Sequence, residues 1–301
     1  IKEWSARTDD GSLSDLHFSP SGEVWDAVKS EHGNCRNRKC GHNEGCFYWR
    51  ARKRLATANV IVVNHALLFS DLVLKDKGIP LLPPYKYIII DEAHNIESVA
   101  ENHFGINVSD RSIEYMTKRL YNPAAKKGLL TYMNAPEAKE AVRNIEGKSK
   151  QFFGLIREWY HENKKENNGR CFKGFMDDGL SEYIVRLKKE LIKLANVSKD
   201  EDEKFELTRY ADQCTILLED LDSFFQQRLD GYVYWLECGS GRRAAARLRS
   251  AAVNVGTDVK RCLFEKYQTV VFTSATLSCG PEGDKTGFDF FAGRIGLEGF
   301  D

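Results

Sequence analysis

The chain has 301 residues, which is enough for two domains with cores of their own, and its 42% hydrophobic and 29% charged residues are typical of a globular protein. It has no secretory signal and no apolar run long enough to span a membrane, so we expect a cytoplasmic protein without a membrane segment. The 44 basic and 44 acidic residues cancel, so the net charge identifies no partner. Because the chain starts at Ile1 and ends abruptly, we expect an internal fragment of a longer protein.

Three cysteines lie close together near the start of the chain in the pattern C-x4-C-x5-C: Cys35, Cys40 and Cys46. Eight cysteines in an intracellular chain do not predict a disulfide framework, and the other five are far apart in the sequence. The close spacing of these three cysteines favours a metal site, but three thiols are one too few for a closed four-ligand site. Three readings stay open: a fourth thiolate from elsewhere, a zinc ion with His42 or His32 as the fourth ligand, and no metal at all.

Basic and aromatic residues surround these cysteines. Between positions 35 and 54 seven basic residues stand against one acid, Glu44. The basic residues are Arg36, Arg38, Lys39, Arg50, Arg52, Lys53 and Arg54. Such a surplus would attract the phosphates of a nucleic acid, and the rings at positions 47–49 would stack on bases. A solvated basic surface, with the rings packed on a neighbouring part of the protein, is the alternative.

Three continuously apolar, β-branched runs predict buried parallel strands. They are Val60–Val63, Tyr87–Ile90 and Thr269–Phe272. Each run ends in polar residues, namely Asn64-His65, Asp91-Glu92 and Thr273-Ser274. Because open α/β sheets bind ligands at the carboxyl ends of their strands, we expect these polar groups to converge on a nucleotide site.

The middle of the chain has apolar residues at helical spacing, as in Ile184, Leu187 and Leu191. Further stripes consist of Ile145, Phe152, Ile156 and Trp159, and of Leu207, Tyr210, Cys214, Leu217 and Leu221. We interpret these stripes as the packing positions of an all-helical domain, at roughly 110–230, that is inserted into the sheet domain. Strand character returns at Gly231–Glu237 and Ala251–Val255.

The strongest chemical signal is YIIIDEAH at residues 87–94. An apolar strand that runs directly into two carboxylates is a Walker B element, because ATP hydrolysis needs Mg²⁺ on the phosphates and a carboxylate that activates water. Asp91 at the strand end suits the metal, through its water shell, and Glu92 suits the base. His94 is expected to couple this site to the Ser-Ala-Thr run at 274–276. A strand that simply ends in a capped turn is the alternative.

Three segments in chain order resemble one known family: the cysteine-rich run at 35–72, YIIIDEAHNIESVA at 87–100 and VVFTSATLS at 270–278. The chain resembles the iron–sulfur helicases of superfamily 2, the DinG/XPD family, and the bacterial DinG branch in particular. The resemblance implies an α/β fold: a partial RecA-like P-loop motor domain with a parallel sheet, interrupted by an iron–sulfur cluster domain and an all-helical arch domain. We expect the cluster domain at 1–57, the motor domain at 58–110 and 231–301, and the arch at 111–230.

The resemblance also implies the ligands and their residues. Cys35, Cys40 and Cys46 match three ligands of a [4Fe–4S] cluster whose fourth cysteine would precede Ile1. Ser274, Ala275 and Thr276 match helicase motif III, which connects the ATP site to the nucleic-acid site. Candidate DNA contacts are Arg36, Arg38, Lys39, Arg50, Arg52, Lys53, Asn64 and His65, although a structural role for Asn64 and His65 is as plausible. The expected partners are ATP, Mg²⁺, single-stranded DNA and duplex junctions, with the protein acting as a monomer and moving 5′ to 3′.

The chain departs from the family in two ways. It has no Walker A loop and none of the motifs of a second motor domain, so we expect this chain alone to be inactive and the complete protein to be the active enzyme. Two other classes of function compete with a helicase: a DinG-like nuclease, and a non-catalytic DNA-binding module with a zinc or iron–sulfur site.

Overall fold

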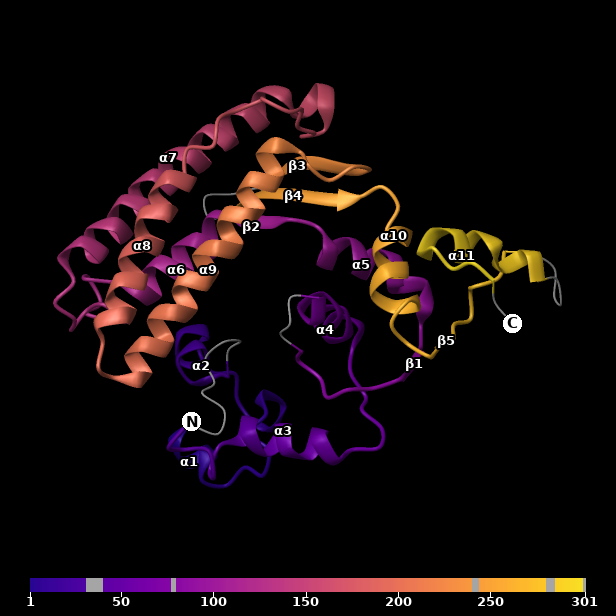
Figure 1. The fold of residues 1–301 in the computed structure, drawn as a ribbon, viewed down its shortest axis with the longest axis horizontal. Coiled ribbons are helices and arrows are strands. Elements are labelled where there is room, and N and C mark those ends of the chain that lie inside the picture. The colour runs from indigo at the N-terminus through magenta and orange to yellow at the C-terminus, as the bar shows by residue number, and fades with distance from the viewer. Residues whose placement is uncertain (31–39, 77–79, 240–243, 280–284, 300–301) are drawn as a thin grey trace. The chain divides into compact units, whose positions relative to one another are not determined.

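A computed structural model describes residues 1–30, 40–76, 80–239, 244–279 and 285–299 (Figure 1). Across these residues the fold is mixed α/β and mostly helical, with one small parallel sheet and one small antiparallel sheet. The chain divides into two compact units, of which the first comprises Ile1–Val63 and Leu82–Pro84 and the second Asn64–Leu81 and Tyr85–Asp301. Among the described helices, none is both long enough and apolar enough to cross a membrane.

The first unit contains the short helices α1 (Lys2–Ser5), η1 (Leu13–Asp15) and α2 (Gly22–Val28) and the longer helix α3 (Phe47–Thr57). The rings of Trp4 and Trp25 lie 6.3 Å apart, and the indole N–H of Trp4 donates to Asp15. Gly11 adopts a positive φ of 70°, and a Cβ at this position would lie 2.5 Å from the ring of Phe47. The turn at Gly11 therefore packs directly on the start of α3.

The described residues of this unit form almost no hydrophobic core. Of its described residues only Leu82 is buried, at 7% exposure, and α3 contains no buried side chain. A unit of this size normally needs a core, a disulfide or a metal centre to be stable.

The second unit begins with α4 (His65–Asp76), β1 (Tyr87–Ile90), the single turn η3 (Ala93–Asn95) and α5 (Ile96–Phe104). It ends with α10 (Gly256–Val259), the π-helical turn η4 (Lys260–Phe264), β5 (Thr269–Phe272), η5 (Lys285–Phe288) and α11 (Asp289–Ile295). Between these two groups lie β2 (Asn107–Ser109), α6 (Asp110–Leu120), α7 (Pro136–Asn167), α8 (Ser181–Val197), α9 (Glu201–Gln226), β3 (Tyr232–Cys238) and β4 (Ala246–Ala252).

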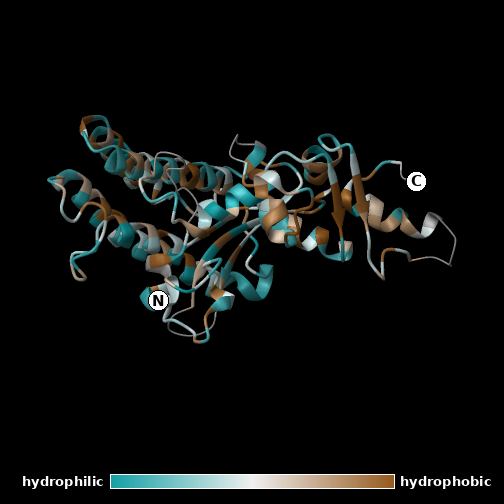
Figure 2. Cartoon of the chain, turned by 90° about the horizontal axis from the view of Figure 1, so that it is seen from below, coloured by the Kyte–Doolittle hydropathy of each residue, from teal (hydrophilic) through white to brown (hydrophobic). Residues whose placement is uncertain are grey.

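β1 and β5 pair in parallel, with Tyr87 opposite Thr269 and Ile90 opposite Phe272. This pairing confirms both predicted strands and their direction. The two strands are coloured as strongly hydrophobic in Figure 2, yet only one face of the pair is well covered. Phe272 packs against Phe264 and Phe291 on the covered face, and Ile90 is buried, whereas Ile89 on the opposite face is 74% exposed.

The third predicted strand, Val60–Val63, is not formed. This segment is coil, and Val60 and Val62 are 80% and 92% exposed. A β-branched apolar run becomes a strand only where a neighbouring strand offers unpaired N–H and C=O groups, and no strand among the described residues pairs with this segment.

The long helices α7, α8 and α9 lie side by side, with α6 against α7 (Figure 1). Their apolar stripes are the predicted ones, and Ile184, Leu187 and Leu191 on α8 are fully buried. The same hydrophobic core includes Leu236 of β3 and Leu248 of β4. These two strands therefore share a core with the helices.

β2, β4 and β3 form an antiparallel sheet in that order. The strand predicted at Gly231–Glu237 is confirmed as β3, displaced by one residue. The strand predicted at Ala251–Val255 is mostly wrong, because β4 ends at Ala252. The buried face of β4 carries small side chains such as Ala246, Ser250 and Ala252, so its alternation of buried and exposed positions is weak in the sequence.

The chain passes from α5 into β2 through Gly105, beside β4. A Cβ on Gly105 would lie 1.8 Å from the carbonyl oxygen of Ser250, so only glycine fits there. The hydroxyl of Ser250 accepts a hydrogen bond from the N–H of Ile106, and Arg249 donates to Asn102 of α5 over 2.7 Å. These contacts hold the end of α5 against β4.

Candidate active site

The carboxyl ends of β1 and β5 are joined beyond the last paired residues of the sheet. The N–H of Thr273 donates to the carbonyl oxygen of Ile90 over 2.9 Å, and the N–H of Ala93 donates to the carbonyl oxygen of Thr273 over 3.0 Å. The two bonds bracket Asp91 and Glu92, so the backbone on both sides of the predicted carboxylate pair is fixed against β5.

Asp91 accepts two hydrogen bonds on the same carboxylate oxygen. Its Oδ1 receives the hydroxyl of Thr273 over 2.6 Å and the N–H of Glu92 over 3.0 Å. These bonds, the one from Thr273 first, hold the pKa of Asp91 below its usual value. Among the described residues the other oxygen, Oδ2, has no hydrogen-bond partner, and the side chain is exposed. Asp91 is therefore an ionised carboxylate with one oxygen available to a ligand.

Glu92 has a left-handed backbone, with φ 50° and ψ 44°. A non-glycine residue in this region is uncommon and indicates a tight local constraint, here the turn between β1 and η3. Its carboxylate is exposed, and Oε2 lies 3.4 Å from Nδ1 of His94. Glu92 therefore points into solvent beside Asp91, where a water molecule has access to it.

His94 joins this turn to the segment after β5. Its Nδ1 lies 2.8 Å from the hydroxyl oxygen of Ser274. Because the nearby carboxylate of Glu92 can only accept, Nδ1 carries the proton in the arrangement that satisfies both neighbours. Of the other two predicted motif residues, Ala275 and Thr276 are exposed, and Ser274 accepts a long contact of 3.5 Å from the N–H of Thr276.

Asn64 and His65 stand at the start of α4 and have structural partners. The side-chain oxygen of Asn64 accepts from the N–H of Leu67 over 2.8 Å and so caps the helix. Nε2 of His65 lies 2.8 Å from the carbonyl oxygen of Asp91. Because a carbonyl only accepts, His65 donates through Nε2 and holds the Asp91 peptide in place.

The other end of α4 is anchored by a buried polar cluster. Asp71, which is fully buried, accepts from the N–H of Leu81 and from the hydroxyl of Tyr85, and pairs with Lys75 over 2.8 Å. The ammonium of Lys75 lies 3.6 Å from the centre of the Tyr85 ring, which stacks on Tyr267. Burial, with Tyr267 and Asp71 adding to it, raises the pKa of Tyr85 well above its usual value, so this hydroxyl stays a donor. α4 is thereby fixed to the segments that lead into β1 and β5.

Two of the three predicted cluster ligands can be located, while Cys35 lies outside the described residues. Cys40 and Cys46 are half-buried, free thiols. Two successive turns join them: the N–H of Asn43 donates to the carbonyl oxygen of Cys40, and that of Cys46 to the carbonyl oxygen of Asn43. Cys46 is the N-cap residue of α3, whose helix dipole favours an anionic ligand there.

The described residues form neither a zinc site nor an iron–sulfur site. Across the part of the chain that the structure describes, no three His, Cys, Asp or Glu side chains are grouped so as to hold a metal ion. Cys40, His42 and Cys46 therefore do not form a three-ligand site; His32, like Cys35, lies outside the described residues.

The basic residues that were predicted to bind DNA differ in their exposure and in their protein partners. Arg50 donates to the carbonyl oxygen of Asp9 and its guanidinium lies 4.7 Å from the centre of the Phe47 ring, so it has a packing role in the first unit. Arg52 is half-buried and Lys53 is exposed. Arg36, Arg38 and Lys39 lie outside the described residues.

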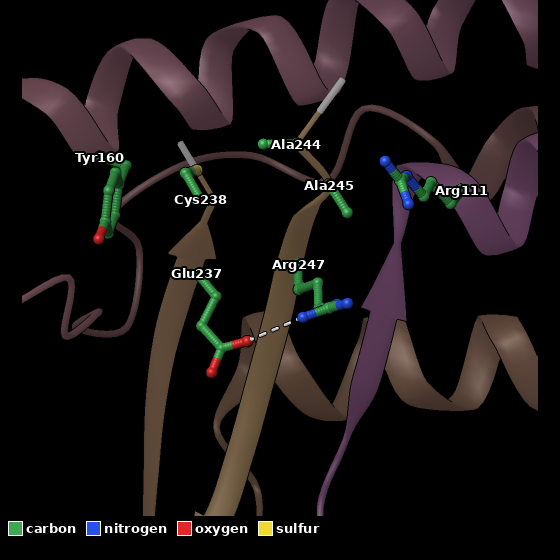
Figure 3. Close-up of a pocket in the computed structure, with 8 residues that line it drawn as sticks. Arg111, Tyr160, Glu237, Cys238, Ala244, Ala245 and Arg247 are labelled. Carbon is green, nitrogen blue, oxygen red and sulfur yellow. Dashed lines mark hydrogen bonds and ion pairs between the residues drawn. The ribbon is translucent and has the colours of Figure 1, made fainter. Parts of the chain in front are cut away.

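A cavity of about 380 Å³ lies elsewhere, where β3 and β4 meet α6 and α7 (Figure 3). Its lining residues are Arg111, Tyr160, Glu237, Cys238, Gly239, Ala244, Ala245 and Arg247. Arg247 and Glu237 form an ion pair across it, and burial raises the pKa of the Cys238 thiol, which is therefore neutral. None of the predicted site residues lines this cavity, whose charged lining residues are two arginines and one glutamate.

Sequence reasoning missed the role of Thr273. It marked the residue only as part of a polar strand end, whereas the structure places its hydroxyl on Asp91. The polar position directly after a buried strand was the available signal, but its partner lies 182 positions away.

Comparison with known proteins finds one family model and several relatives that match this chain. The DEAD_2 family model matches residues 31–113, which include the three clustered cysteines and the Asp91-Glu92 pair. The ATP-dependent DNA helicase YoaA of Escherichia coli (strain K12) is 27% identical, over 99% of this chain and 44% of its own length. The 3′-5′ exonuclease DinG of Bacillus subtilis (strain 168) is 25% identical, over 99% of this chain and 35% of its own length. The ATP-dependent helicase DinG of Mycobacterium tuberculosis (strain ATCC 25618 / H37Rv) is 31% identical over 32% of this chain.

The chain spans less than half the length of these relatives. The similarity to YoaA and to the Bacillus DinG nevertheless extends over nearly all of its residues, and the DEAD_2 match covers the strand end that carries both carboxylates. The chain thus contains a DEAD_2 region at residues 31–113 and is homologous over nearly all of its length to the proteins named YoaA and DinG.

Proposed function

We propose that this chain forms part of an ATP-dependent DNA helicase and contributes the residues that hydrolyse ATP and transmit the event to DNA. The observation that carries the proposal is the junction of β1 and β5. There Asp91 and Glu92 directly follow one parallel strand, and Thr273 and Ser274, which directly follow the other, both contact this turn. One relative that matches 99% of this chain is named as an ATP-dependent DNA helicase, which supports the same function.

The two carboxylates fit different roles. Asp91 has one open oxygen and stays ionised, which suits a carboxylate that holds the water shell of Mg²⁺. The metal, when bound, supplies charge neutralisation on the phosphate oxygens. Glu92 faces solvent on the adjacent position, so it orients the attacking water and accepts its proton.

His94 and Ser274 form the link from this site to the segment after β5. His94 has its Nδ1 proton shared between Ser274 and Glu92, at 2.8 and 3.4 Å. A change in the charge near Glu92 during hydrolysis therefore alters the hydrogen bond to Ser274. We assign His94 to coupling, with Ser274, Ala275 and Thr276 as the segment that moves with it.

We further propose that Cys35, Cys40 and Cys46 hold a [4Fe–4S] cluster together with a cysteine from the complete protein. Two features support this. The turns between Cys40 and Cys46 lead straight into the N-terminus of α3, and the first unit has only one buried described side chain. A metal cluster would supply the stability that a hydrophobic core does not supply there.

The proposed architecture is a RecA-like motor domain with a cluster domain at 1–57 and a helical arch at 111–230 as insertions. Single-stranded DNA would run past the basic residues around α3, and by resemblance the movement would be 5′ to 3′. Arg52 and Lys53 are better candidates for phosphate contact than Arg50, whose guanidinium already has protein partners.

The test uses the complete protein, purified without oxygen. We expect ATP hydrolysis that depends on single-stranded DNA, unwinding of duplexes with a 5′ overhang rather than a 3′ overhang, and about four irons and four sulfides per chain. No ATP hydrolysis with any DNA would contradict the proposed function. One zinc and no sulfide would contradict the cluster while leaving the site at Asp91 intact.

A nuclease is the second candidate, because one relative that matches 99% of this chain is named as a 3′-5′ exonuclease. The same preparation distinguishes the two. Degradation of single-stranded DNA from its 3′ end without ATP, and no unwinding with ATP, would favour the nuclease over the helicase.

A further inference from the structure

We propose that Thr273 is a positioning residue that orients the Asp91 carboxylate for metal binding. The inference rests on the proposed function, because it assigns a task to Thr273 within the same site. Thr273 lies one position before the Ser-Ala-Thr run and directly follows β5.

The backbone of Thr273 is fixed on both sides of Asp91. Its N–H donates to the carbonyl oxygen of Ile90 and its carbonyl oxygen accepts from Ala93. Thr273 therefore cannot move along β1 without breaking two main-chain hydrogen bonds. This gives its side chain a defined position from which to reach the carboxylate.

The side-chain contact selects one oxygen of Asp91. The hydroxyl of Thr273 donates to Oδ1 over 2.6 Å, and the N–H of Glu92 donates to the same oxygen. With Oδ1 occupied twice, the carboxylate is held in one rotamer and Oδ2 is the oxygen presented outward. A hydroxyl donor at this distance is a charge-assisted hydrogen bond, which also favours the ionised form that a cation requires.

The neighbouring hydroxyl has a different task. Ser274 contacts His94, and Thr273 contacts Asp91. Two adjacent residues after β5 therefore bind two different residues after β1. Loss of Ser274 should therefore affect coupling, whereas loss of Thr273 should affect the metal.

The test compares three variants of the complete protein. Thr273→Val keeps the volume and removes the donor, and Thr273→Ser keeps the donor. Thr269→Val is the matched control, because Thr269 is an exposed residue at the start of the same strand. The readouts are Mn²⁺ binding in the presence of ADP and the Mg²⁺ concentration that half-saturates ATP hydrolysis.

We expect Thr273→Val to weaken Mn²⁺ binding and to raise the half-saturating Mg²⁺ concentration by roughly tenfold, since one charge-assisted hydrogen bond is lost. Thr273→Ser and Thr269→Val should stay close to the unchanged protein.

Unchanged Mn²⁺ binding and Mg²⁺ dependence in Thr273→Val would overturn the inference, as would equal losses in Thr273→Ser and Thr273→Val, which would indicate a packing role only. A protein that binds no Mn²⁺ with ADP would also overturn it. If Mn²⁺ binding follows the expected order but the unchanged protein hydrolyses no ATP, the inference stands and the proposed function fails.

Discussion

Nδ1 of His94 lies 2.8 Å from the hydroxyl oxygen of Ser274, so one hydrogen bond joins two segments that are 180 positions apart in the sequence. The helical region, from α6 to α9, lies between them in the chain. The contact forms because β1 and β5 pair in parallel and bring their carboxyl ends to the same edge of the sheet.

Replacing Ser274 should uncouple ATP hydrolysis from DNA movement. We expect Ser274→Ala in the complete protein to lower the rate of unwinding by roughly tenfold, the effect of losing one functional hydrogen bond, while ATP hydrolysis falls much less. Strand separation and phosphate release are measured on the same substrate. Ser98→Ala, on an exposed position of α5, is the control; an equal loss of both activities in Ser274→Ala would contradict the coupling role.

His65 should matter through the main chain of Asp91. His65→Leu removes the Nε2 donor to the Asp91 carbonyl oxygen, whereas His65→Gln places an amide donor at a similar reach. We expect the leucine variant to lose about 1 kcal/mol of stability and most of its ATP hydrolysis, and the glutamine variant to retain much of both. Equal behaviour of the two variants in hydrolysis and denaturant unfolding would mean that the contact has no such role.

The local elements near the site could be predicted from the sequence, and their partners could not. Tyr87–Ile90 and Thr269–Phe272 are β-branched runs with polar ends, and both are strands with the expected bounds. The Asp91-Glu92 pair follows directly from this pattern. The contacts of Asp91 with Thr273 and His65 depend on pairing between distant segments, which no local pattern encodes.

Val60–Val63 is as apolar and β-branched as those strands and yet is coil. The difference is tertiary, because a strand needs a partner edge and periodicity does not identify one. β4 is the opposite case, a strand that the sequence pattern did not predict over most of its length. Its inward side chains are mostly small, so this strand of seven residues has a weak apolar pattern.

The buried cluster at the end of α4 should be important for stability. Asp71→Ala leaves Lys75 and the Leu81 N–H without this acceptor in a buried setting, so we expect a loss of about 3–5 kcal/mol in the free energy of unfolding. Denaturant titration of the complete protein measures it. The control is Glu114→Ala, which removes an exposed ion pair with Lys118 and should cost about 0.5 kcal/mol or less. A similar small cost for both would contradict the buried role.

Two glycine substitutions should change stability in opposite directions. Gly105→Ala places a Cβ against the carbonyl oxygen of Ser250 and must shift β2 or β4, so we expect a loss of about 2–3 kcal/mol. Gly147→Ala adds a methyl group in open space on the exposed face of α7 and should add about 1 kcal/mol. Thermal or denaturant unfolding compares the two. No difference between them would mean that Gly105 is not closely packed.

The most direct test of the central claim is ATP hydrolysis by the complete protein carrying Glu92→Gln, measured in a single turnover with single-stranded DNA. Glu166→Gln, on an exposed position of α7, is the matched control. If Glu92 activates the attacking water, the variant binds ATP as before and its hydrolysis falls by about 100-fold or more, while the control is unchanged. Hydrolysis at the normal rate in Glu92→Gln would contradict the assignment of this strand end as the active site.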